Sequence, residues 1–508
     1  MKIVRPALLL LTSLLIACGD GDSGSSSQPA LLPLHATRGD SPAIFDSAGR
    51  QVLLRGVNLN SLGDYYQASP ELPTVFPFEA SFFADMAAQG FNVVRLLLSW
   101  SALEPERDQI DQTYLSQVRK AVDAAAANGI YVVLDMHQDA WGKYIASPED
   151  VVCPAGREPA IGWDGAPEWA TLTDGADTCR SPGFREGSPA VETAFLSFYE
   201  DRDGIQGQLV KTWAAVAREL ANEPAVAGYD LINEPHYVNV SRSETAADLG
   251  RYYARSIEAI RAAESEGGGF SHIVFFEPLI NFPLVGSTPP ADFTADTNIV
   301  FAPHNYAESI NSFFTIEMQF QTIQRAASRY HTTFWIGEWG WFGDPVANEP
   351  RVRRYGIQED STLTGGTWWQ WLQACGDPHN LSGAVASGDY APGVDAAPPE
   401  QILYHRIFCP GENYEGIEEW AKVLGRPRPL AAPGRIVSLE SDGAAGTMHL
   451  VGDATGAAAG ATLDVWVPER AGQPTLTGTG LLSASTQTVR GGYLVRAEVG
   501  GQYDIRLE

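Results

Sequence analysis

Gly228-Tyr-Asp-Leu-Ile-Asn-Glu-Pro-His236 is a short apolar run that changes abruptly to polar residues and a proline. An apolar run of about four to eight residues bounded by turn residues is typical of a strand in a buried parallel sheet. Asn233 and Glu234 follow this run directly. The stretch therefore predicts a strand whose carboxyl end delivers polar side chains to a loop.

Similar runs recur along the chain and alternate with helical patterns. The predicted strands are Val52–Asn58, Asn92–Leu98, Tyr131–Met136, Val226–Leu231, Ile273–Phe276, Ile299–Ala302, Phe334–Ile336 and Gly366–Trp369. Apolar residues spaced three or four apart predict helices over Tyr114–Asn128, Gln206–Ala221, Ala246–Glu264 and Phe314–His331. Eight alternating units predict an α/β protein built on a closed (β/α)8 TIM barrel, for which about 250 residues suffice.

The composition narrows the classes of partner. The 508 residues include 62 acidic and 34 basic side chains, which gives a formal net charge of −28. Because phosphate binding depends on basic surface, we expect no nucleic acid partner. The sequence has neither a glycine-rich phosphate loop nor clustered metal ligands, so we expect no cofactor and no metal. The oligomeric state stays open, with a monomer as the default.

The amino terminus has the pattern of an export signal. Lys2 and Arg5 precede an apolar run that ends in Leu15-Ile-Ala-Cys18, which resembles a bacterial lipobox. We therefore expect residues 1–17 to be a lipoprotein signal peptide, Cys18 to be lipidated and residues 18–35 to form a flexible tether. The expected protein is exported and anchored to the cell envelope. The alternative is an ordinary secretory signal, an incidental Cys18 and a secreted protein.

Four further cysteines predict disulfides, because an exported protein meets an oxidising compartment. Of the three pairings open to them, we prefer Cys153 with Cys179 and Cys375 with Cys409, since each would close an irregular loop. One of these disulfides lies inside, and the other begins in, two long insertions, 140–197 and 373–400, which we expect to overhang a cleft. Tolerated surface insertions are the alternative.

The carboxyl-terminal part of the chain differs in pattern. After Pro427-Arg-Pro-Leu-Ala-Ala-Pro433 the sequence shows short alternating runs, which predict a small all-β, sandwich-like domain over 433–508. The catalytic barrel would then occupy 36–428. Exposed aromatic residues could let the small domain bind carbohydrate or lipid. A rigid structural appendage is favoured, because the domain has few aromatic residues suited to such binding, namely Trp466, Tyr493 and Tyr503.

Two carboxylates indicate the chemistry. Trp335-Ile-Gly-Glu-Trp-Gly340 delivers Glu338 at the end of another strand, where it would complement Glu234. Such a pair cleaves a glycosidic bond when one group protonates the leaving oxygen and the other attacks the anomeric carbon or activates water. Arg95, a cation in a buried run, could hold Glu338 ionised as the nucleophile. Glu234, without such a cation, would keep its proton and act as the acid. The alternative for each carboxylate is a salt bridge at the barrel rim.

Other polar and aromatic residues follow the predicted strands and should meet at the same end of the barrel. They are His137, Asp139, Asn233, His304, Tyr306 and Trp369. Taken singly, His137 and His304 are more often structural histidines than catalytic ones. Trp369 could present a flat apolar surface to a sugar ring, although Trp368 and Trp371 compete for that role.

With these residues in order, the chain resembles glycoside hydrolase family 5 over roughly residues 45 to 425. The resemblance implies a retaining enzyme in which Glu234 is the acid/base and Glu338 the nucleophile, with carboxyl groups about 5 Å apart. It also implies that Asn233 contacts the sugar 2-hydroxyl and that Arg95 and Tyr306 support the nucleophile. The subsite for the attacked sugar would be lined by His137, His304 and Trp369.

Within that family, several stretches resemble the endoglycoceramidase group. They are Trp100-Ser-Ala-Leu-Glu-Pro105, Leu134-Asp-Met-His-Gln-Asp139, Gly165-Ala-Pro-Glu-Trp-Ala170 and Tyr229-Asp-Leu-Ile-Asn-Glu-Pro235. The resemblance implies cleavage between oligosaccharide and ceramide in glycosphingolipids, with Asp139 on a hydroxyl of the first sugar. A β-glucanase, a glycosidase for another glycolipid such as a steryl glucoside, and a non-catalytic glycan-binding surface lipoprotein are the alternatives.

The aromatic residues of the first insertion admit two interpretations. They could line a groove for an apolar aglycone or stack on sugars, or they could fill a small core. These residues are Trp141, Tyr144, Trp163, Trp169, Phe195 and Phe198.

Overall fold

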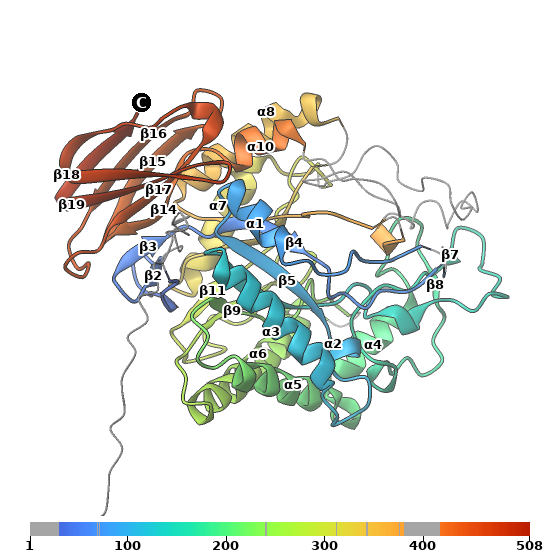
Figure 1. Ribbon diagram of the computed structural model, residues 1–508. Helices are drawn as coiled ribbons and strands as arrows, with labels where there is room; N and C mark the ends of the chain where they lie inside the picture. Colours follow the sequence, from blue (N-terminus) through green and yellow to red (C-terminus); the bar gives the residue numbers. More distant parts are fainter. Residues whose placement is uncertain are drawn as a thin grey trace, which may run out of the picture.

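The computed structural model describes residues 30–379 and 417–508, apart from 69, 71, 239, 240, 311, 342, 343 and 375. A parallel sheet of eight strands lies at its centre, in the order β11-β10-β9-β6-β5-β4-β13-β12 (Figure 1). The strands are β4 (Arg55–Leu59), β5 (Val93–Ser99), β6 (Tyr131–His137), β9 (Val226–Asp230), β10 (Ile273–Phe276), β11 (Ile299–Phe301), β12 (Ile336–Trp339) and β13 (Gly366–Trp368). Each matches one predicted strand.

The sheet closes on itself between β11 and the residues that precede β12. Phe301 and Phe334 form a parallel bridge, and the amide of Trp335 donates to the carbonyl of Phe301 at 2.9 Å. The predicted (β/α)8 barrel is thereby confirmed. β12 begins at Ile336, later than the predicted start at Phe334. Phe334 forms only the isolated bridge to Phe301 of β11, and pairing with β13 starts at Ile336.

Helices cover the outside of the barrel. They are α1 (Ser81–Ala88), α2 (Trp100–Leu103), α3 (Gln112–Ala127), α4 (Pro189–Tyr199), α5 (Ile205–Glu219), α6 (Arg242–Glu266), α7 (Ile316–Arg329), α8 (Pro345–Ser361) and α10 (Glu418–Leu424). Asp111 caps α3 by accepting hydrogen bonds from the amides of Thr113 and Tyr114, and Ser241 and Glu244 form a capping box on α6. No helix among the described residues combines the length and apolarity needed to span a bilayer.

The interior of the barrel changes character along its axis. Side chains alternate across each strand, so Val93 and Arg95 on β5 share one face, as do Val133, Asp135 and His137 on β6. Val93 and Val133 belong to a buried apolar cluster. The later residues on the same faces are charged. The alternation therefore places apolar packing at the amino ends of the strands and polar side chains at their carboxyl ends.

A second, antiparallel sheet forms the all-β region. Its strands are β1 (Leu34–Ala36), β2 (Ile44–Asp46), β3 (Arg50–Val52), β14 (Arg428–Pro433), β15 (Arg435–Asp442), β16 (Thr447–Asp453), β17 (Leu463–Pro468), β18 (Leu476–Val489) and β19 (Gly492–Leu507). Their order is β1-β2-β3-β14-β17-β19-β16-β15, with β18 paired to β19. The sheet includes β1, which starts inside the range 18–35 expected to be a tether. It also includes β2, β3 and β14, which begin before 433, the expected start of the all-β domain. It therefore crosses the boundaries expected from the sequence.

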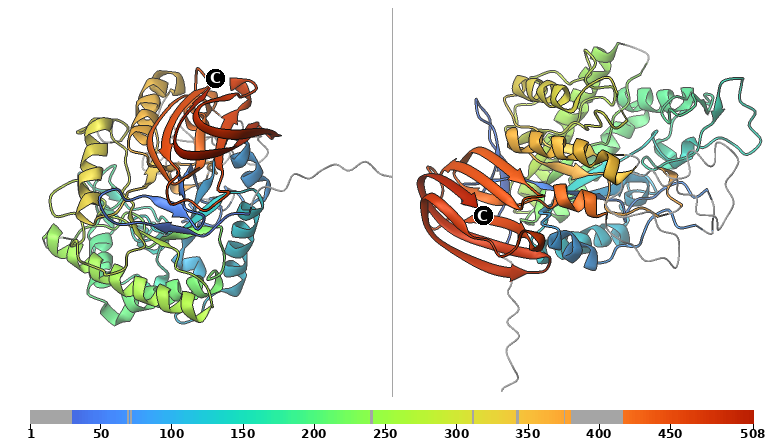
Figure 2. Two further views of the ribbon diagram at one scale, coloured as in Figure 1. Left: turned by 90° about the vertical axis from the view of Figure 1, so that its left-hand side faces the viewer. Right: turned by 90° about the horizontal axis from the view of Figure 1, so that it is seen from above.

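The all-β region lies at the opposite end of the barrel from the first insertion (Figures 1 and 2). Leu34 and Ile44 pack into the same apolar cluster as Val93 and Val133, so β1 and β2 cover the amino ends of the barrel strands. Trp466 and Tyr503 are buried, which agrees with a structural role for these two aromatic residues.

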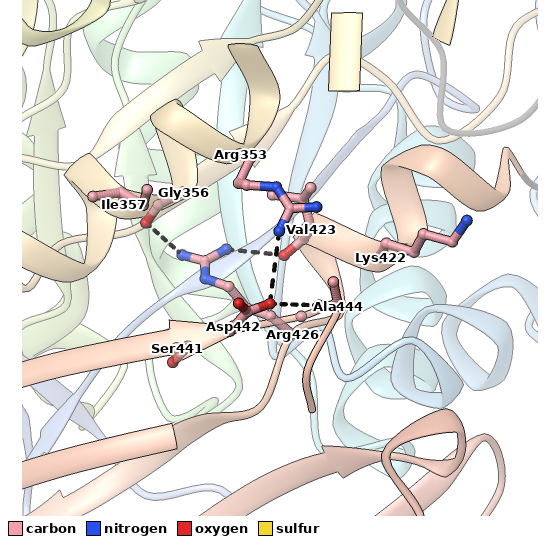
Figure 3. Close-up of a pocket in the computed structure, with 10 residues that line it drawn as sticks. Arg353, Gly356, Ile357, Lys422, Val423, Arg426, Ser441, Asp442 and Ala444 are labelled. Atoms are coloured by element: carbon pink, nitrogen blue, oxygen red, sulfur yellow. Dashed lines mark hydrogen bonds and ion pairs between the residues drawn. The ribbon is translucent and has the colours of Figure 1, made fainter. Parts of the chain in front are cut away.

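Buried arginines join the barrel to the all-β region beside a small pocket. Arg426 contacts Glu359 at 3.0 Å and Asp360 at 2.9 Å on α8, and Arg55 at the start of β4 contacts Asp360 at 2.6 Å. Figure 3 shows the pocket, where α8, α10 and the end of β15 meet. The ion pairs fix α8 between the two sheets.

Candidate active site

Arg95 lies at the centre of the site and is completely buried on β5. Its guanidinium contacts Asp135 at 2.9 Å, Asp230 at 3.0 Å, Glu277 at 3.1 Å and Glu338 at 2.8 Å. Burial alone would lower the pKa of Arg95, but these carboxylates raise it well above its ordinary value. The prediction that Arg95 is paired, with Glu338 among its partners, is confirmed.

Burial shifts the pKa of two of the carboxyl groups that contact Arg95. Burial is the largest cause that raises the pKa of Asp230 well above its ordinary range, and burial also raises the pKa of Glu277. Arg95 opposes both shifts. Burial and Arg95 therefore act in opposite directions on the pKa of Asp230 and Glu277, while Arg95 also contacts Glu338.

Glu338 projects from β12 and is buried. Its Oε1 accepts from Arg95 Nη1 at 2.8 Å, and its Oε2 accepts from Tyr306 Oη at 3.0 Å. A Cβ at Gly337 would lie 3.0 Å from Nε2 of His304, so the glycine before Glu338 permits a close approach. One cation and one hydroxyl therefore hold this carboxylate in a fixed orientation.

The backbone presents Glu234 in a conformation that few non-glycine residues adopt, with φ of 39°. Its amide donates to Oε2 of Glu277 at 3.0 Å. Gln138 Nε2 donates to the carbonyls of Asn233 at 2.7 Å and Glu234 at 3.2 Å. These bonds hold the turn after β9 and point the Glu234 side chain toward Glu338.

The two carboxylates are close. One oxygen of Glu234 and one of Glu338 lie within 4.8 Å of each other and of a nitrogen of His304. Retaining glycosidases place their carboxyl groups about 5 Å apart, whereas inverting enzymes need about 6.5–9.5 Å to admit a water between them. The separation fits direct attack by one carboxylate on the sugar.

His304 connects the carboxylates. Its Nδ1 lies 2.8 Å from Oε1 of Glu234 and 3.4 Å from Oε2 of Glu338, and its Nε2 lies 3.2 Å from Glu277. Burial alone would lower the pKa of His304, but the charges of Glu277 and Glu338 and the hydrogen bond to Glu234 raise it well above its ordinary value. A proton on His304 is therefore shared with both catalytic candidates.

The expectation that Glu234 lacks a cationic partner is wrong. Arg185 reaches from the first insertion and places Nη2 2.5 Å from Oε2 of Glu234. Burial would raise the pKa of Glu234, but the hydrogen bond from His304 and the charge of Arg185 lower it. The free site therefore favours the ionised form of this carboxylate.

The predicted sugar-binding residues come together beside this pair. Nδ1 of His137 lies 2.7 Å from the accepting carboxylate of Asp135, and the His137 ring stacks on Trp369 with centroids 5.4 Å apart. Asp139 lies 3.8 Å from His137 and 3.1 Å from His379. His379 also contacts the Trp369 ring, at 5.1 Å between centroids. These residues form one wall of the site.

Asn233 occupies the space between that wall and Arg95. Its Oδ1 accepts from Arg95 Nη2 at 3.0 Å, while its Nδ2 donates to the carbonyl of Gln138 at 3.1 Å and lies 3.5 Å from Nε2 of His137. These contacts fix the side-chain amide next to Glu234, where the predicted contact with a sugar hydroxyl requires it.

The three tryptophans that compete for the sugar-binding role differ in their neighbours. Trp368 packs edge-on against Trp339 at 4.9 Å, and Trp371 packs against Phe91 at 6.5 Å. Both are buried among apolar residues. Trp369 is buried in the same cluster, but its ring lies beside His137 and His379, and its contact with a sugar stays a prediction.

Most aromatic residues of the first insertion form a core. Trp141 packs against Phe195 at 4.9 Å and Phe198 at 5.3 Å, and all three are buried. Trp163 is also buried, and Trp169 packs against Trp100. Tyr144 is exposed. Core filling is therefore the interpretation that the structure favours for this group.

A disulfide braces the same insertion, which also contains β7 (Glu158–Pro159) and β8 (Cys179–Arg180). The predicted bond between Cys153 and Cys179 is present, with Cα atoms 5.6 Å apart. The predicted pair of Cys375 and Cys409 lies outside the described residues, and so does Cys18, the predicted site of lipidation.

Two groups of side chains have spacings that a metal ion could use. They are Glu234 with His304 and Glu338, and His137 with Asp139 and Asp164. Arg185 contacts one carboxylate of each group, at 2.5 Å from Glu234 and 2.7 Å from Asp139. A divalent cation would face this fixed charge, so the donor sets suit protons and sugar hydroxyls better than a metal.

Sequence reasoning missed several residues of the site. Glu277 directly follows β10, so the rule that found the other strand-end residues would have found it. Asp135 and Asp230 lie inside strands, and a buried charge near Arg95 was the available signal. Arg185 lies in an irregular insertion, where no periodic pattern distinguishes it from other arginines.

A closed (β/α)8 barrel with two carboxylates this close at the carboxyl ends of its strands defines a glycosidase of the retaining type. The sequence pattern described as "Cellulase (glycosyl hydrolase family 5)" matches residues 45–374. The chain belongs to glycosyl hydrolase family 5.

Similar proteins include enzymes named for glycosphingolipids. Endoglycoceramidase I of Rhodococcus hoagii (strain 103S) is 29% identical over 290 residues, which cover 54% of this chain and 53% of that protein, so the match spans about half the length of this relative. The crystal structure of an endogalactoceramidase is 43% identical, with a TM-score of 0.84, and the match covers 94% of this chain and 99% of that one. A Rhodococcus sp. endo-glycoceramidase II, solved as a ganglioside GM3 complex, shares the fold at 22% identity with a TM-score of 0.69, covering 92% of this chain and 98% of that one.

Proposed function

We propose that the protein is a retaining endo-β-glycosidase that hydrolyses the bond between oligosaccharide and ceramide in glycosphingolipids. The observation that carries the proposal is the pair Glu234 and Glu338, whose nearest carboxylate oxygens lie within 4.8 Å of each other. Similarity along almost the whole chain to an endogalactoceramidase supports the lipid substrate.

The contacts of the two carboxylates support a different role for each. Glu338, held by Arg95 and Tyr306, attacks the anomeric carbon, while Glu234 gives its proton to the departing ceramide oxygen. Water then attacks the glycosyl-enzyme as Glu234 takes its proton, and the ester bond to Glu338 breaks. Asn233, His137 and Trp369 position the sugar.

Apolar side chains near the site's rim support a lipid aglycone. Exposed residues occur in the loops that follow neighbouring strands β10 and β11, and in the first insertion beside Arg185. They are Leu284, Val285, Ile310, Phe313 and Phe184. Because loops after barrel strands surround the active site, a ceramide leaving Glu234 would meet an apolar border there.

The proposal extends to the location of the enzyme. A lipid attached at Cys18 would keep the exported protein at the cell envelope and raise its effective concentration at lipid surfaces. The lipobox-like ending Leu15-Ile-Ala-Cys18 supports this assignment. Incorporation of labelled palmitate by the full chain, and its loss in Cys18→Ala, would test it; equal labelling of both would refute it.

Product analysis tests the activity. The protein beginning at residue 30 is incubated in detergent with mixed glycosphingolipids, with steryl glucosides and with a β-glucan panel, and products are identified by mass spectrometry. Intact oligosaccharide plus free ceramide is the expected result. Release of sterol or of short glucans without ceramide would replace the proposed substrate, and binding without turnover would indicate a lectin.

The nucleophile is tested with an isosteric variant. Glu338→Gln removes the attacking carboxylate but not its volume, so we expect kcat on the cleaved glycolipid to fall by about a thousandfold or more. Glu258→Gln, the same change on the exposed face of α6, is the control and should leave kcat unchanged. Turnover of Glu338→Gln near the wild-type rate would contradict the assigned mechanism.

A further inference from the structure

Arg185 is the feature of the site that the proposed mechanism does not use. One nitrogen of its guanidinium, Nη2, lies 2.5 Å from Glu234 and 2.7 Å from Asp139. Nε of the same side chain contacts Glu186, and the guanidinium carbon lies 5.2 Å from the centre of the Trp163 ring. Contacts on three sides therefore hold the cation against the acid/base.

The chain delivers Arg185 from a rigid part of the insertion. Cys179, shortly before it, is joined to Cys153, and Arg180 contacts Glu158 at 2.9 Å. The amide of Ser181 also donates to the carbonyl of Gly187 at 3.1 Å, which closes the turn that carries Arg185. The position of the cation is therefore set by the insertion and not by the barrel.

Charged groups face Glu234 from each neighbouring element. His304 after β11 contributes positive charge at 2.8 Å, and Arg185 contributes it from the opposite oxygen. Negative charge comes from Glu338 on β12, Glu277 after β10 and Asp139 after β6. His304 is shared with Glu338 and Glu277. Arg185 is therefore the cation that can act on Glu234 without also holding the nucleophile.

We propose that Arg185 is a positioning residue that sets the charge state of the acid/base, favouring the ionised Glu234 that activates water over the protonated Glu234 that releases the aglycone. This inference rests on the proposed function. Under this proposal, a residue of the first insertion controls the relative rates of the two half-reactions, formation and hydrolysis of the glycosyl-enzyme.

The two half-reactions need opposite forms of the same group. In the first, the glycosidic C–O bond breaks, the leaving oxygen takes the proton of Glu234, and Glu338 bonds to the anomeric carbon. In the second, water gives a proton to ionised Glu234 and its oxygen replaces Glu338. Arg185 stabilises the ionised form, which ends the first step and begins the second. It therefore lowers the pH above which the first step fails.

Paired substrates test this role in the full enzyme. Both substrates contain the sugar of the glycolipid that the wild type cleaves best. One carries the natural lipid as its leaving group. The other carries dinitrophenol, which departs as the phenolate and needs no proton from Glu234. On the lipid substrate, kcat/KM of the wild type should decline on the alkaline side of its pH profile. For Arg185→Met, we expect the midpoint of this decline to rise by about one to three pH units. The profile on the dinitrophenyl substrate should not move.

Two variants serve as controls. Arg185→Lys keeps the positive charge, so the midpoint of its alkaline decline in kcat/KM should lie within about half a pH unit of the wild-type value. This result is expected if Arg185 acts through its charge. Arg202→Met removes an arginine that pairs with exposed Asp174 at the edge of the same insertion and should change neither profile. A purely structural Arg185 would lower activity in Arg185→Met equally at every pH and on both substrates, which would overturn the proposal.

A chemical titration decides the question without turnover. Carbodiimide labels carboxyl groups in their protonated form, and peptide mass spectrometry reads the labelling of Glu234 as a function of pH. The midpoint should rise in Arg185→Met and stay near wild type in Arg185→Lys. Equal midpoints in all three proteins would overturn the proposal. Absence of glycolipid turnover by wild type would refute the proposed function, and the titration would still test Arg185.

Discussion

Tyr306 makes one hydrogen bond that bears directly on the nucleophile. Its Oη donates to Glu338 Oε2 at 3.0 Å, and burial and the charge of Glu338 raise the pKa of Tyr306 well above its ordinary value, so the donor keeps its proton. A hydrogen bond to a charged group contributes about 1.5–3 kcal/mol. We expect Tyr306→Phe to lower kcat/KM by about ten- to a hundredfold.

Steady-state kinetics on the cleaved glycolipid check this prediction. Tyr144→Phe, the same change at an exposed tyrosine of the first insertion, is the matched control. An unchanged kcat/KM in Tyr306→Phe would mean that Arg95 alone orients Glu338.

Asp164 links stability to pH. Burial raises its pKa to about 7, with His137 opposing the rise and Asp139 adding to it. The unfolded chain releases this proton near pH 3.9. Between these pH values the folded state binds more protons than the unfolded state, so its stability falls as pH rises from about 4 to 7.

Asp164→Asn should remove this dependence. Relative to the variant, we expect wild type to lose up to about 4 kcal/mol of unfolding free energy across that window. Urea unfolding at several pH values measures it, with Asp150→Asn, an exposed aspartate of the same insertion, as control. Parallel stability curves for wild type and Asp164→Asn would show that Asp164 is ionised in the fold.

Among the single residues of the site, those that directly follow a predicted barrel strand could be identified from the sequence. Glu234, Glu338, His304 and Tyr306 follow apolar runs, so the tendency of barrel strands to present function at their carboxyl ends located them. Arg185 obeyed no such rule, because its place depends on how an irregular insertion folds back. The charge state expected for Glu234 was wrong for that reason.

Among the elements, the first insertion depends most on one covalent bond. The bond between Cys153 and Cys179 closes a loop with a sequence separation of 26, for which chain entropy gives about 3 kcal/mol of stabilisation. We expect Cys153→Ser combined with Cys179→Ser to raise the rate of limited proteolysis within 153–187. Peptide mapping of the cut sites measures it.

Cleavage in the barrel helices serves as the internal control for that experiment, since α3 and α6 do not contact the disulfide. Their cutting rates should stay at the wild-type level. A double variant that resists proteolysis as well as wild type would show that the aromatic packing of Trp141, Phe195 and Phe198 suffices to hold the insertion.

Elements with strong periodicity were predictable and those set by tertiary contacts were not. The apolar spacing of Tyr114–Asn128 located α3 to within two residues, and the run Tyr131–Met136 located β6. β1 to β3 are three residues each, too short for a pattern to emerge, and they join the second sheet through the pairing of β3 with β14, far along the chain. The local sequence around β1, β2 and β3 therefore could not predict that these strands belong to the second sheet.

For the whole molecule, the second sheet is a condition of stability. β14 pairs with β3 on one side and β17 on the other, and Leu53 packs in a cluster with Val465 and Ile505. A chain that ends at Pro433 would lack Val465 and Ile505 and would expose Leu53 to water. We expect it to be insoluble or to lose cooperative thermal unfolding, whereas a chain that begins at residue 30 should keep both properties.

Solubility and thermal unfolding of the two truncated proteins, measured side by side, check this expectation. A soluble barrel ending at Pro433 with wild-type unfolding temperature would show that the all-β region is dispensable.

The pairing of β3 with the far end of the chain also governs the timing of folding during synthesis. The amide of Ile436 donates to the side chain of Gln51, 385 residues earlier, in the same neighbourhood where β3 meets β14. Ribosomes add roughly 5–20 residues per second, so the first strands wait at least about 20 seconds for their partners. During that interval the edge of β3 that pairs with β14 has no partner strand. The nascent chain should therefore depend on chaperones that hold unfolded segments until its last residues emerge.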